Sequence, residues 1–169
     1  MGCPAPATRV AAVKRFASIL AGLRPPSYPA RSLELGCGPF ATHSILQARF
    51  PGWLHAGLEI DADELRPARS RPVILADAQR LPFCAAFALI LIRHPDVALH
   101  PDGWSAVLAG CPRVLVDGGI LVATTYSLEE REFVRRRVAL ERCVVDETAL
   151  APVNLAGEDR CVLAYVKAG

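Results

Sequence analysis

The chain has 169 residues, the usual length of one domain and enough to bury about two thirds of the surface that the unfolded chain exposes. Its 19 basic and 17 acidic residues nearly cancel, and the net charge of +2 excludes the strong overall field of a nucleic-acid or membrane-surface binder. Hydrophobic residues make up 52% of the chain, but its longest apolar run, Phe83–Ile92, is far shorter than the roughly 20 residues of a membrane-spanning helix.

Residues 1–30 are predicted to form a helix and a proline-rich linker ahead of a single compact domain, residues 31–169. Apolar residues recur at helical spacing over Thr8–Leu23, with basic residues between them, which predicts an amphipathic helix. Thr8 is the expected cap of this helix. Three prolines within Pro25–Pro29 then end the helical pattern, because proline cannot continue a helix.

Five short apolar segments follow, separated by connections of which most are long enough for a helix. They are the predicted strands: Ser32–Leu35, Leu54–Ile60, Pro72–Ala76, Phe87–Ile92 and Ile120–Thr125. Helices are expected between them, with a turn before the fifth strand: Phe40–Phe50, Ala62–Ser70, Trp104–Leu115 and the turn Asp117–Gly119. This alternation requires parallel crossovers, so the sequence predicts an α/β fold with a doubly wound sheet and helices on both faces.

The C-terminal part is predicted to add antiparallel strands. Ser127–Glu130 is a capping box that opens a helix reaching about Arg142. Cys143–Glu147 and Arg160–Lys167 have the pattern of two strands joined by the loop Pro152–Asp159. The expected sheet is therefore seven-stranded and mostly parallel, with an antiparallel C-terminal edge strand.

The six cysteines indicate neither a zinc site nor a disulfide framework, because they form no C-x-x-C pair and no histidine lies at finger-like spacing. Free thiols suit a reducing compartment, so we expect a cytoplasmic protein without a metal. Pro6 stands where a myristoylation signal needs Ser or Thr, and Lys14 and Arg15 interrupt any signal-peptide core. We therefore expect no targeting segment.

Polar residues and glycines follow four consecutive predicted strands. They are Glu34, Gly36 and Gly38 at the first strand, Glu59 and Asp61 at the second, Asp77 at the third, and Arg93, His94 and Asp96 at the fourth. Ligands of open parallel sheets bind at such carboxyl ends. A dinucleotide loop would need a third glycine where Ala41 stands, so the acidic loop favours a cationic, phosphate-free nucleoside such as S-adenosylmethionine. A nicotinamide-dependent oxidoreductase is the alternative that the glycine pair and Glu59 leave open.

Four segments, in this order, resemble the class I S-adenosylmethionine-dependent methyltransferases, a Rossmann-like superfamily. They are Leu33–Pro39, Gly57–Asp61, Leu75–Phe83 and Gly118–Val122. The resemblance covers most of the chain, roughly residues 32–125, and implies a methyltransferase with S-adenosyl-L-methionine as its cofactor. The chain departs from the family pattern at Ala88, where many members carry an acid, and at the missing third glycine.

The resemblance also implies roles for single residues around the cofactor. Gly36 and Gly38 would pack beside the methionine part, with Cys37 in the same loop and Glu34 near it. Glu59 would accept from both ribose hydroxyls, since an ionised carboxylate can accept from two adjacent donors. Its alternative is a solvated carboxylate at a strand end, in which case Asp61 is the next candidate.

On the same resemblance, Asp77 would accept from the adenine amino group, and Ile60 and Ala78 would wall the ring. Arg93, at the end of the fourth strand, is placed with the cofactor set. Its neighbour His94 is the candidate catalytic residue, because its unperturbed pKa lies near neutrality and suits a general base. A capping or core histidine fixed beside Pro95 is the alternative for His94.

The acids at the strand ends favour an S-adenosylmethionine-dependent methyltransferase, for which we expect a small-molecule acceptor. The expected acceptor-facing side chains are Tyr28, His94, Tyr126 and Asn154. Methyl transfer asks mainly for in-line placement of the acceptor, so a catalytic base need not exist. The alternative function is a methyltransferase-like accessory protein that acts through a partner, because little of the chain beyond the minimal fold remains to build a substrate lid. A protein partner or a homodimer is compatible with the sequence. The Arg131–Arg137 cluster alternates with glutamates, which favours a salt-bridged face over a nucleic-acid site.

Overall fold

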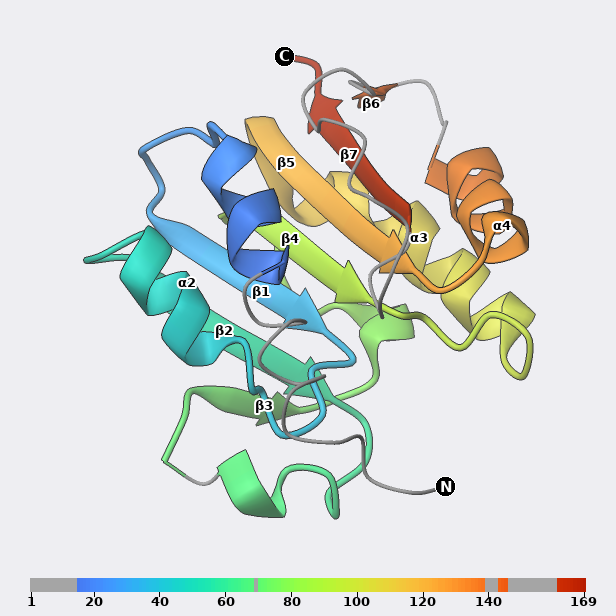
Figure 1. Ribbon diagram of the computed structural model, residues 1–169, viewed down its shortest axis with the longest axis horizontal. Coiled ribbons are helices and arrows are strands. Elements are labelled where there is room, and N and C mark those ends of the chain that lie inside the picture. Colours follow the sequence, from blue (N-terminus) through green and yellow to red (C-terminus); the bar gives the residue numbers. More distant parts are fainter. Residues whose placement is uncertain (1–14, 69, 139–142, 146–160) are drawn as a thin grey trace.

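The computed structural model describes residues 15–68, 70–138, 143–145 and 161–169. Its sheet has the strand order β3-β2-β1-β4-β5-β7, with β6 beside β7. The bounds are β1 Arg31–Leu35, β2 Leu54–Glu59, β3 Val73–Leu75, β4 Phe87–Arg93, β5 Leu115–Thr125, β6 Cys143–Val145 and β7 Cys161–Lys167. Strands β1 to β5 pair in parallel, whereas β7 is antiparallel to both β5 and β6 (Figure 1).

The predicted α/β class, mostly parallel sheet and antiparallel last strand are confirmed. The last strand, β7, lies between β5 and the three-residue β6, so β6 and not the C-terminal strand stands at this edge. The predicted continuation of β6 to Glu147 and the loop Pro152–Asp159 lie outside the described residues. In the described ranges, none of the helices is both long and apolar enough to cross a membrane.

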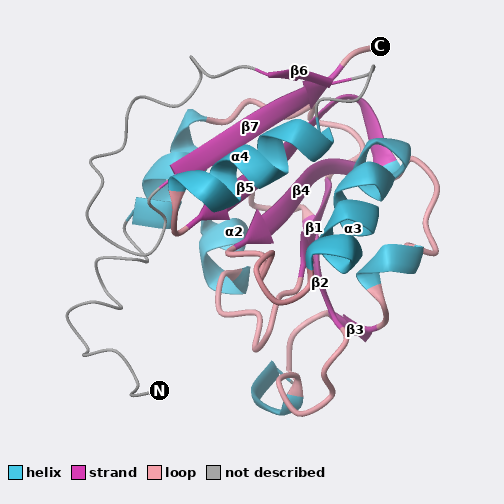
Figure 2. Cartoon of the chain, turned by 90° about the vertical axis from the view of Figure 1, so that its right-hand side faces the viewer, coloured by secondary structure: helices cyan, strands magenta, loops and turns pink. Residues whose placement is uncertain are grey.

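Helices cover both faces of the sheet. The helical residues 15–22 and α2 (His43–Arg49) lie on one face, and α3 (Pro101–Val114) and α4 (Leu128–Val138) lie on the other (Figures 1 and 2). The alternation of side chains along β4 explains this arrangement. Leu89 and Leu91 join the core under α2, whereas the intervening Ile90 joins the core under α3, and all three are fully buried. A strand buried on both faces needs a continuous apolar run.

The N-terminal helical residues belong to this core. Phe16, Ile19 and Leu20 are at most 1% exposed and pack with the sheet residues on the α2 face. The Arg49 guanidinium group ties the end of this helix to α2, because its Nε donates to the Leu20 carbonyl oxygen at 3.1 Å. The predicted cap Thr8 lies outside the described residues.

Helix boundaries differ from the predictions where short-range geometry decides them. Helix α3 begins at Pro101, three residues before the predicted start, because proline is favoured in the first turn, where no helix partner exists for its missing N–H. The predicted helix Ala62–Ser70 is only a 3₁₀ turn, η1 (Arg66–Ala68).

The capping box is confirmed: the Glu130 backbone N–H donates to Ser127 Oγ at 3.1 Å, and the Glu130 carboxylate accepts from the Ser127 N–H. The predicted extension to Arg142 lies beyond the described residues.

Strand β5 is longer than predicted and contains the predicted turn. It begins at Leu115 rather than Ile120, and its register with β4 shifts between Phe87 and Leu89. Gly118, at φ +74°, lies within this irregular stretch, in a conformation that glycine adopts without strain.

Strand β1 lies between β2 and β4, so the chain winds outward in both directions from this point. The connections after β1 and β4 therefore diverge and leave a crevice at the carboxyl ends of these strands. The fold thus predicts a ligand site beside the loop that follows β1.

Candidate functional site

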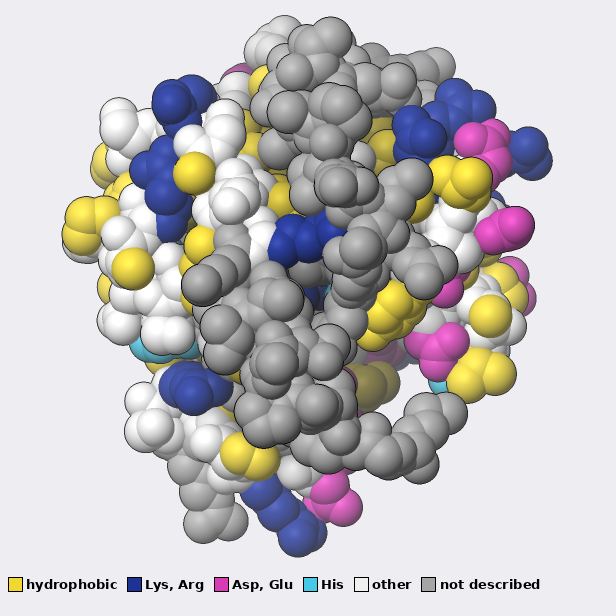
Figure 3. Space-filling model, viewed as in Figure 1, with side chains coloured by type: hydrophobic (Ala, Val, Ile, Leu, Met, Phe, Trp, Pro, Cys, Tyr) yellow, Lys and Arg dark blue, Asp and Glu magenta, His cyan; other side chains and the backbone are white. Residues whose placement is uncertain are grey.

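A cavity of about 690 Å³ lies at the carboxyl ends of β1, β2 and β4, in the size range of small-molecule sites. Five segments line it: the loop after β1, the end of β2, the 3₁₀ turn η2 (Ala78–Arg80) after β3, the end of β4 and the start of α3. On the space-filling surface, hydrophobic and acidic side chains border the right side of a hollow that lies below and to the right of the centre (Figure 3).

The loop after β1 folds back over β2. Gly36 and Gly38 have φ of +65° and +49°, which favour glycine, and the Gly36 N–H donates to the Leu58 carbonyl oxygen at 2.9 Å. Gly57 makes this close approach possible, because a Cβ at Gly57 would lie 2.5 Å from the Cys37 sulfur. The loop backbone is thereby fixed at the edge of the cavity.

Glu59, at the end of β2, is an acidic lining residue whose carboxylate is held by the backbone. Its Oε2 accepts from the Gly38 N–H at 2.9 Å, and its Oε1 accepts from Ile60 at 2.8 Å and Asp61 at 3.1 Å. A carboxylate has about four acceptor positions, so about one remains, on Oε2. The predicted contact with two ribose hydroxyls would therefore require one backbone hydrogen bond to be released. Asp61 does not line the cavity; its Oδ1 accepts from the Asp63 N–H.

Asp77 and its neighbours form the next side of the cavity. The Asp77 Oδ1 accepts from the Gln79 N–H at 2.9 Å and so caps the turn η2. Ile60 contributes an apolar wall that is 65% exposed, and Ala78 also lines the cavity. Such a set combines a carboxylate acceptor with small and apolar surfaces, as a flat heteroaromatic ring with an amino group would require.

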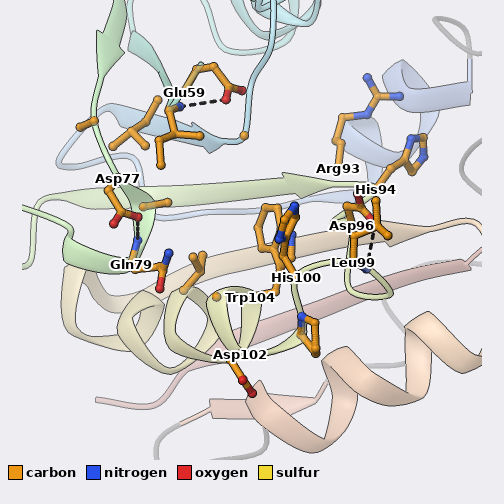
Figure 4. A pocket seen from close by; sticks show the side chains of 18 residues that line it. Glu59, Asp77, Gln79, Arg93, His94, Asp96, Leu99, His100, Asp102 and Trp104 are labelled. Carbon is orange, nitrogen blue, oxygen red and sulfur yellow. Dashed lines mark hydrogen bonds between the residues drawn. The ribbon is translucent and has the colours of Figure 1, made fainter. Parts of the chain in front are cut away.

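Three residues at the end of β4, the β4-end group, line the opposite side (Figure 4): Arg93, His94 and Asp96. The Arg93 guanidinium carbon lies 4.5 Å from the centroid of the Phe16 ring. His94 has φ of +52°, a strained conformation for a residue with a side chain, and its ring lies 4.0 Å from the Tyr126 ring between centroids. Its backbone N–H donates to the Thr124 carbonyl oxygen at 2.8 Å, which holds this turn against β5.

Four polar or aromatic residues of the described cavity lining were not predicted as site residues from the sequence. They are His100, Asp102 and Trp104 at the start of α3, and Gln79 in the turn η2. The signal for three of them was present in the sequence, because Pro101 marks a helix start eight residues after Arg93, the last residue of β4. The predicted start of α3 at Trp104 hid the fact that the first turn of this helix faces the strand ends.

The structure brings most of the predicted site residues together on the cavity. The lining includes Gly36, Glu59, Ile60, Asp77, Ala78, Arg93 and His94. Glu34 lies in β1, and Cys37 and Gly38 lie in the loop after it. None of the three lines the cavity, so their contact with a cofactor stays a prediction. The Glu34 carboxylate is 3% exposed and accepts from the Thr42 hydroxyl. Burial, together with the nearby charges of Glu34 and Glu59, raises the pKa of the Cys37 thiol to about 12.

The predicted acceptor wall is only partly assembled. His94 lines the cavity, and the Tyr126 ring lies against the His94 ring at a tilt of 33°. Tyr28 is 86% exposed and is not among the lining residues. Asn154 lies outside the described residues. The part of this wall that the structure supports is therefore the His94–Tyr126 pair.

Residues 33–123, more than half of the chain, match a family model described as "Methyltransferase domain". No curated protein matches the sequence. Among solved structures, the S-adenosylmethionine-bound amino pentose methyltransferase CalS10 from Micromonospora echinaspora has a TM-score of 0.71 at 16% identity, over 99% of both chains. The N-methyltransferase NodS from Bradyrhizobium japonicum has a TM-score of 0.68 at 16% identity, over 95% of this chain and 96% of NodS.

A third similar structure is the complex between the Haloferax volcanii Trm112 methyltransferase activator and the putative methyltransferase. The matched chain has a TM-score of 0.66 at 14% identity, with 96% of this chain and 94% of that chain covered. At these identities the three likenesses show a shared fold.

Proposed function

The chain belongs to the methyltransferase-domain family, and on this premise we propose that it transfers a methyl group from S-adenosyl-L-methionine to a small-molecule acceptor. The observation that carries the proposal is the cavity at the switch point of the sheet, with the glycine loop, Glu59 and Asp77 on its lining or directly beside it. Both carboxylates follow strand ends, as the sequence pattern predicts.

The lining fits an adenosyl group. Glu59 is preorganised by three backbone N–H groups and keeps about one acceptor position, which would receive a ribose hydroxyl. Asp77 uses one oxygen to cap η2 and would accept from the adenine amino group with the other. Ile60 and Ala78 supply the apolar surface beside the ring. Gly36, which has no side chain, leaves room along the loop for the methionine part.

The β4-end group would face the acceptor. When bound, the cofactor supplies an electrophilic methyl group on a sulfonium centre. The chain holds the acceptor in line with it, and such placement alone can supply much of the rate enhancement. His94 would accept the proton that the nucleophilic atom of the acceptor releases, and its strained backbone and its contact with Tyr126 fix the orientation of the imidazole.

A small molecule is the proposed acceptor class because the cavity, of about 690 Å³, encloses a ligand of limited size together with the cofactor. The similarity to an amino pentose methyltransferase and to an N-methyltransferase supports this class. The Arg131–Arg137 segment gives no support to a nucleic-acid acceptor, since Arg135 and Arg136 both pair with Glu132 at 2.8 Å.

Calorimetric titration of the full chain with S-adenosylmethionine tests the proposal, with reduced nicotinamide dinucleotide titrated in parallel as the competing cofactor. We expect saturable binding of the methyl donor alone. Absence of binding at millimolar concentration, or preference for the dinucleotide, would sink the proposed function. Formation of S-adenosylhomocysteine by the isolated chain in the presence of candidate acceptors would then show turnover without a partner.

A further inference from the structure

Trp104 lies against the glycine loop at the start of α3. Its ring atoms Cη2 and Cζ2 are 3.3 and 3.7 Å from the position that a Cβ would take on Gly36. The side chain is half-buried because it also packs against the core between α3 and the sheet. The indole ring is therefore positioned on the cavity wall before a ligand binds, at the loop expected to hold the methionine part.

In the close view, Trp104 and His100 lie between two groups of lining side chains (Figure 4). The carboxylates of Glu59 and Asp77 lie on one side, and the β4-end group lies on the other. On the proposed function, the first side holds the adenosine and the second faces the acceptor. The sulfur atom connects the adenosine to the methionine part and carries the methyl group, so its place is between these sides, near the indole.

The indole offers an interaction that depends on charge. Trp104 is the only Trp, Tyr or Phe among the described residues that line this cavity. Two other aromatic rings lie close to the β4-end group: Phe16 is covered by the Arg93 guanidinium group, and Tyr126 lies against the His94 ring. A cation within about 6 Å of an aromatic ring is attracted by the ring quadrupole, most strongly by that of tryptophan, and a neutral sulfur atom lacks this attraction.

We propose that Trp104 is a specificity residue that makes the cavity prefer a ligand with a positive charge at the sulfur position. The proposal rests on the proposed function and deepens it. S-adenosylmethionine carries the sulfonium charge, whereas S-adenosylhomocysteine, the product, has a neutral thioether. Once the methyl group has been transferred, the attraction by Trp104 is gone, so this residue favours exchange of product for a new donor molecule.

The cavity carboxylates are the competing source of charge preference. Asp96 and Asp102 both line the cavity, and either could attract a cation over several ångströms. A ring and a carboxylate differ in one respect that mutation can separate: phenylalanine keeps an aromatic face, whereas leucine keeps only the apolar volume. Asp96→Asn removes the charge of one carboxylate and leaves the ring.

The test measures dissociation constants of three adenosyl ligands by calorimetry. S-adenosylmethionine and sinefungin carry a positive charge at or beside the sulfur position, and S-adenosylhomocysteine does not. In Trp104→Leu, the preference for each cationic ligand over S-adenosylhomocysteine should fall by about 2- to 30-fold, the range of cation–π energies. Trp104→Phe should retain much of the preference. Melting curves of both variants check that the domain is folded.

Trp53→Phe is the matched control. Trp53 precedes β2 at its amino end and stacks on Phe50 at 4.8 Å between centroids, and the six residues of β2 place it about 20 Å from the cavity. We expect unchanged affinities in this variant. It also leaves Trp104 as the sole tryptophan, so its fluorescence should respond to the ligands.

Three results would overturn the inference. The first is an unchanged preference of Trp104→Leu for cationic over neutral ligands. The second is a loss of affinity in Trp104→Leu that is equally large for cationic and neutral ligands. The third is a change of this preference that occurs in Asp96→Asn and not in Trp104→Leu. Each of these leaves the proposed function intact as long as the wild-type chain binds S-adenosylmethionine. Failure of the wild-type chain to bind it would remove both proposals.

Discussion

Replacement of Glu59 by alanine should weaken cofactor binding while the domain stays folded. The carboxylate accepts from three backbone N–H groups in partly buried hydrogen bonds, but Ile60 and Asp61 are exposed residues, so water can replace the carboxylate at these two. The unfolding free energy should therefore fall by about 1–3 kcal/mol, mainly through the partly buried Gly38 N–H. Loss of a charged hydrogen bond to a ribose hydroxyl costs about 1.5–3 kcal/mol, which corresponds to roughly 10- to 150-fold weaker binding.

The assay pairs Glu59→Ala with Asp61→Ala, a carboxylate two residues away that lies outside the cavity lining. Calorimetry gives the dissociation constant for S-adenosylmethionine, and denaturant titration gives the stability of each variant. We expect a large loss of affinity in Glu59→Ala and wild-type affinity in Asp61→Ala. Unchanged affinity in Glu59→Ala would refute the assignment, and equal losses in the two variants would show that general charge, rather than a ribose contact, is responsible.

Three further predictions concern the loop and the sheet beneath it. Gly57→Ala should destabilise the domain by about 1–3 kcal/mol, measured by denaturant titration, because the new Cβ would overlap the Cys37 sulfur. Iodoacetamide at pH 8 should modify the exposed Cys84 and spare Cys37, whose pKa is raised to about 12, as peptide mass spectrometry would show. Burial lowers the pKa of His55, whose ring nitrogen Nδ1 lies 2.7 Å from the Ser32 hydroxyl oxygen. At a pH below 6.5, the ordinary pKa of histidine, the unfolded chain therefore binds more protons than the folded chain. The contribution of His55 to stability should be complete above pH 6.5 and fall on acidification, as denaturant titration at several pH values would show.

Each of these has its own control. Alanine at the exposed Gly52, where a Cβ would meet no atom within 4 Å, separates overlap from backbone strain, and a smaller loss at Gly57 than at Gly52 would contradict the packing argument. Cys37 should become reactive in denaturant; modification in the native state at the rate of Cys84 would show that the loop opens readily. His55→Gln should flatten the fall in stability on acidification below the ordinary histidine pKa of 6.5, and a dependence as steep as that of the wild-type chain would assign it to other groups.

The strands and the position of the site could be predicted because both depend on local patterns. The run Phe87–Ile92 has no polar residue and therefore suits only a strand buried on both faces, which β4 is. Glu59 and Asp77 follow apolar segments directly, and the parallel topology brings such strand ends to one edge. Once the crossovers were inferred, the grouping of these side chains followed from the sequence.

The remainder of the site depends on distances between elements, which no local pattern contains. Trp104 reaches the glycine loop only because Pro101 starts α3 just after β4, and the contact with Gly36 joins segments far apart in the chain. The backbone hydrogen bonds that occupy Glu59 likewise arise from the turn of the chain at Ile60 and Asp61. The sequence could identify Glu59 as an acceptor but could not show how many of its positions are already filled.

A crystal structure of the chain with S-adenosylhomocysteine would show directly whether the cavity holds the cofactor. We expect the adenosine between Glu59 and Asp77, with the sulfur atom beside Trp104 and the open side of the cavity toward His94. A ligand bound elsewhere on the chain, or an adenine ring on the side of the β4-end group, would contradict this expectation.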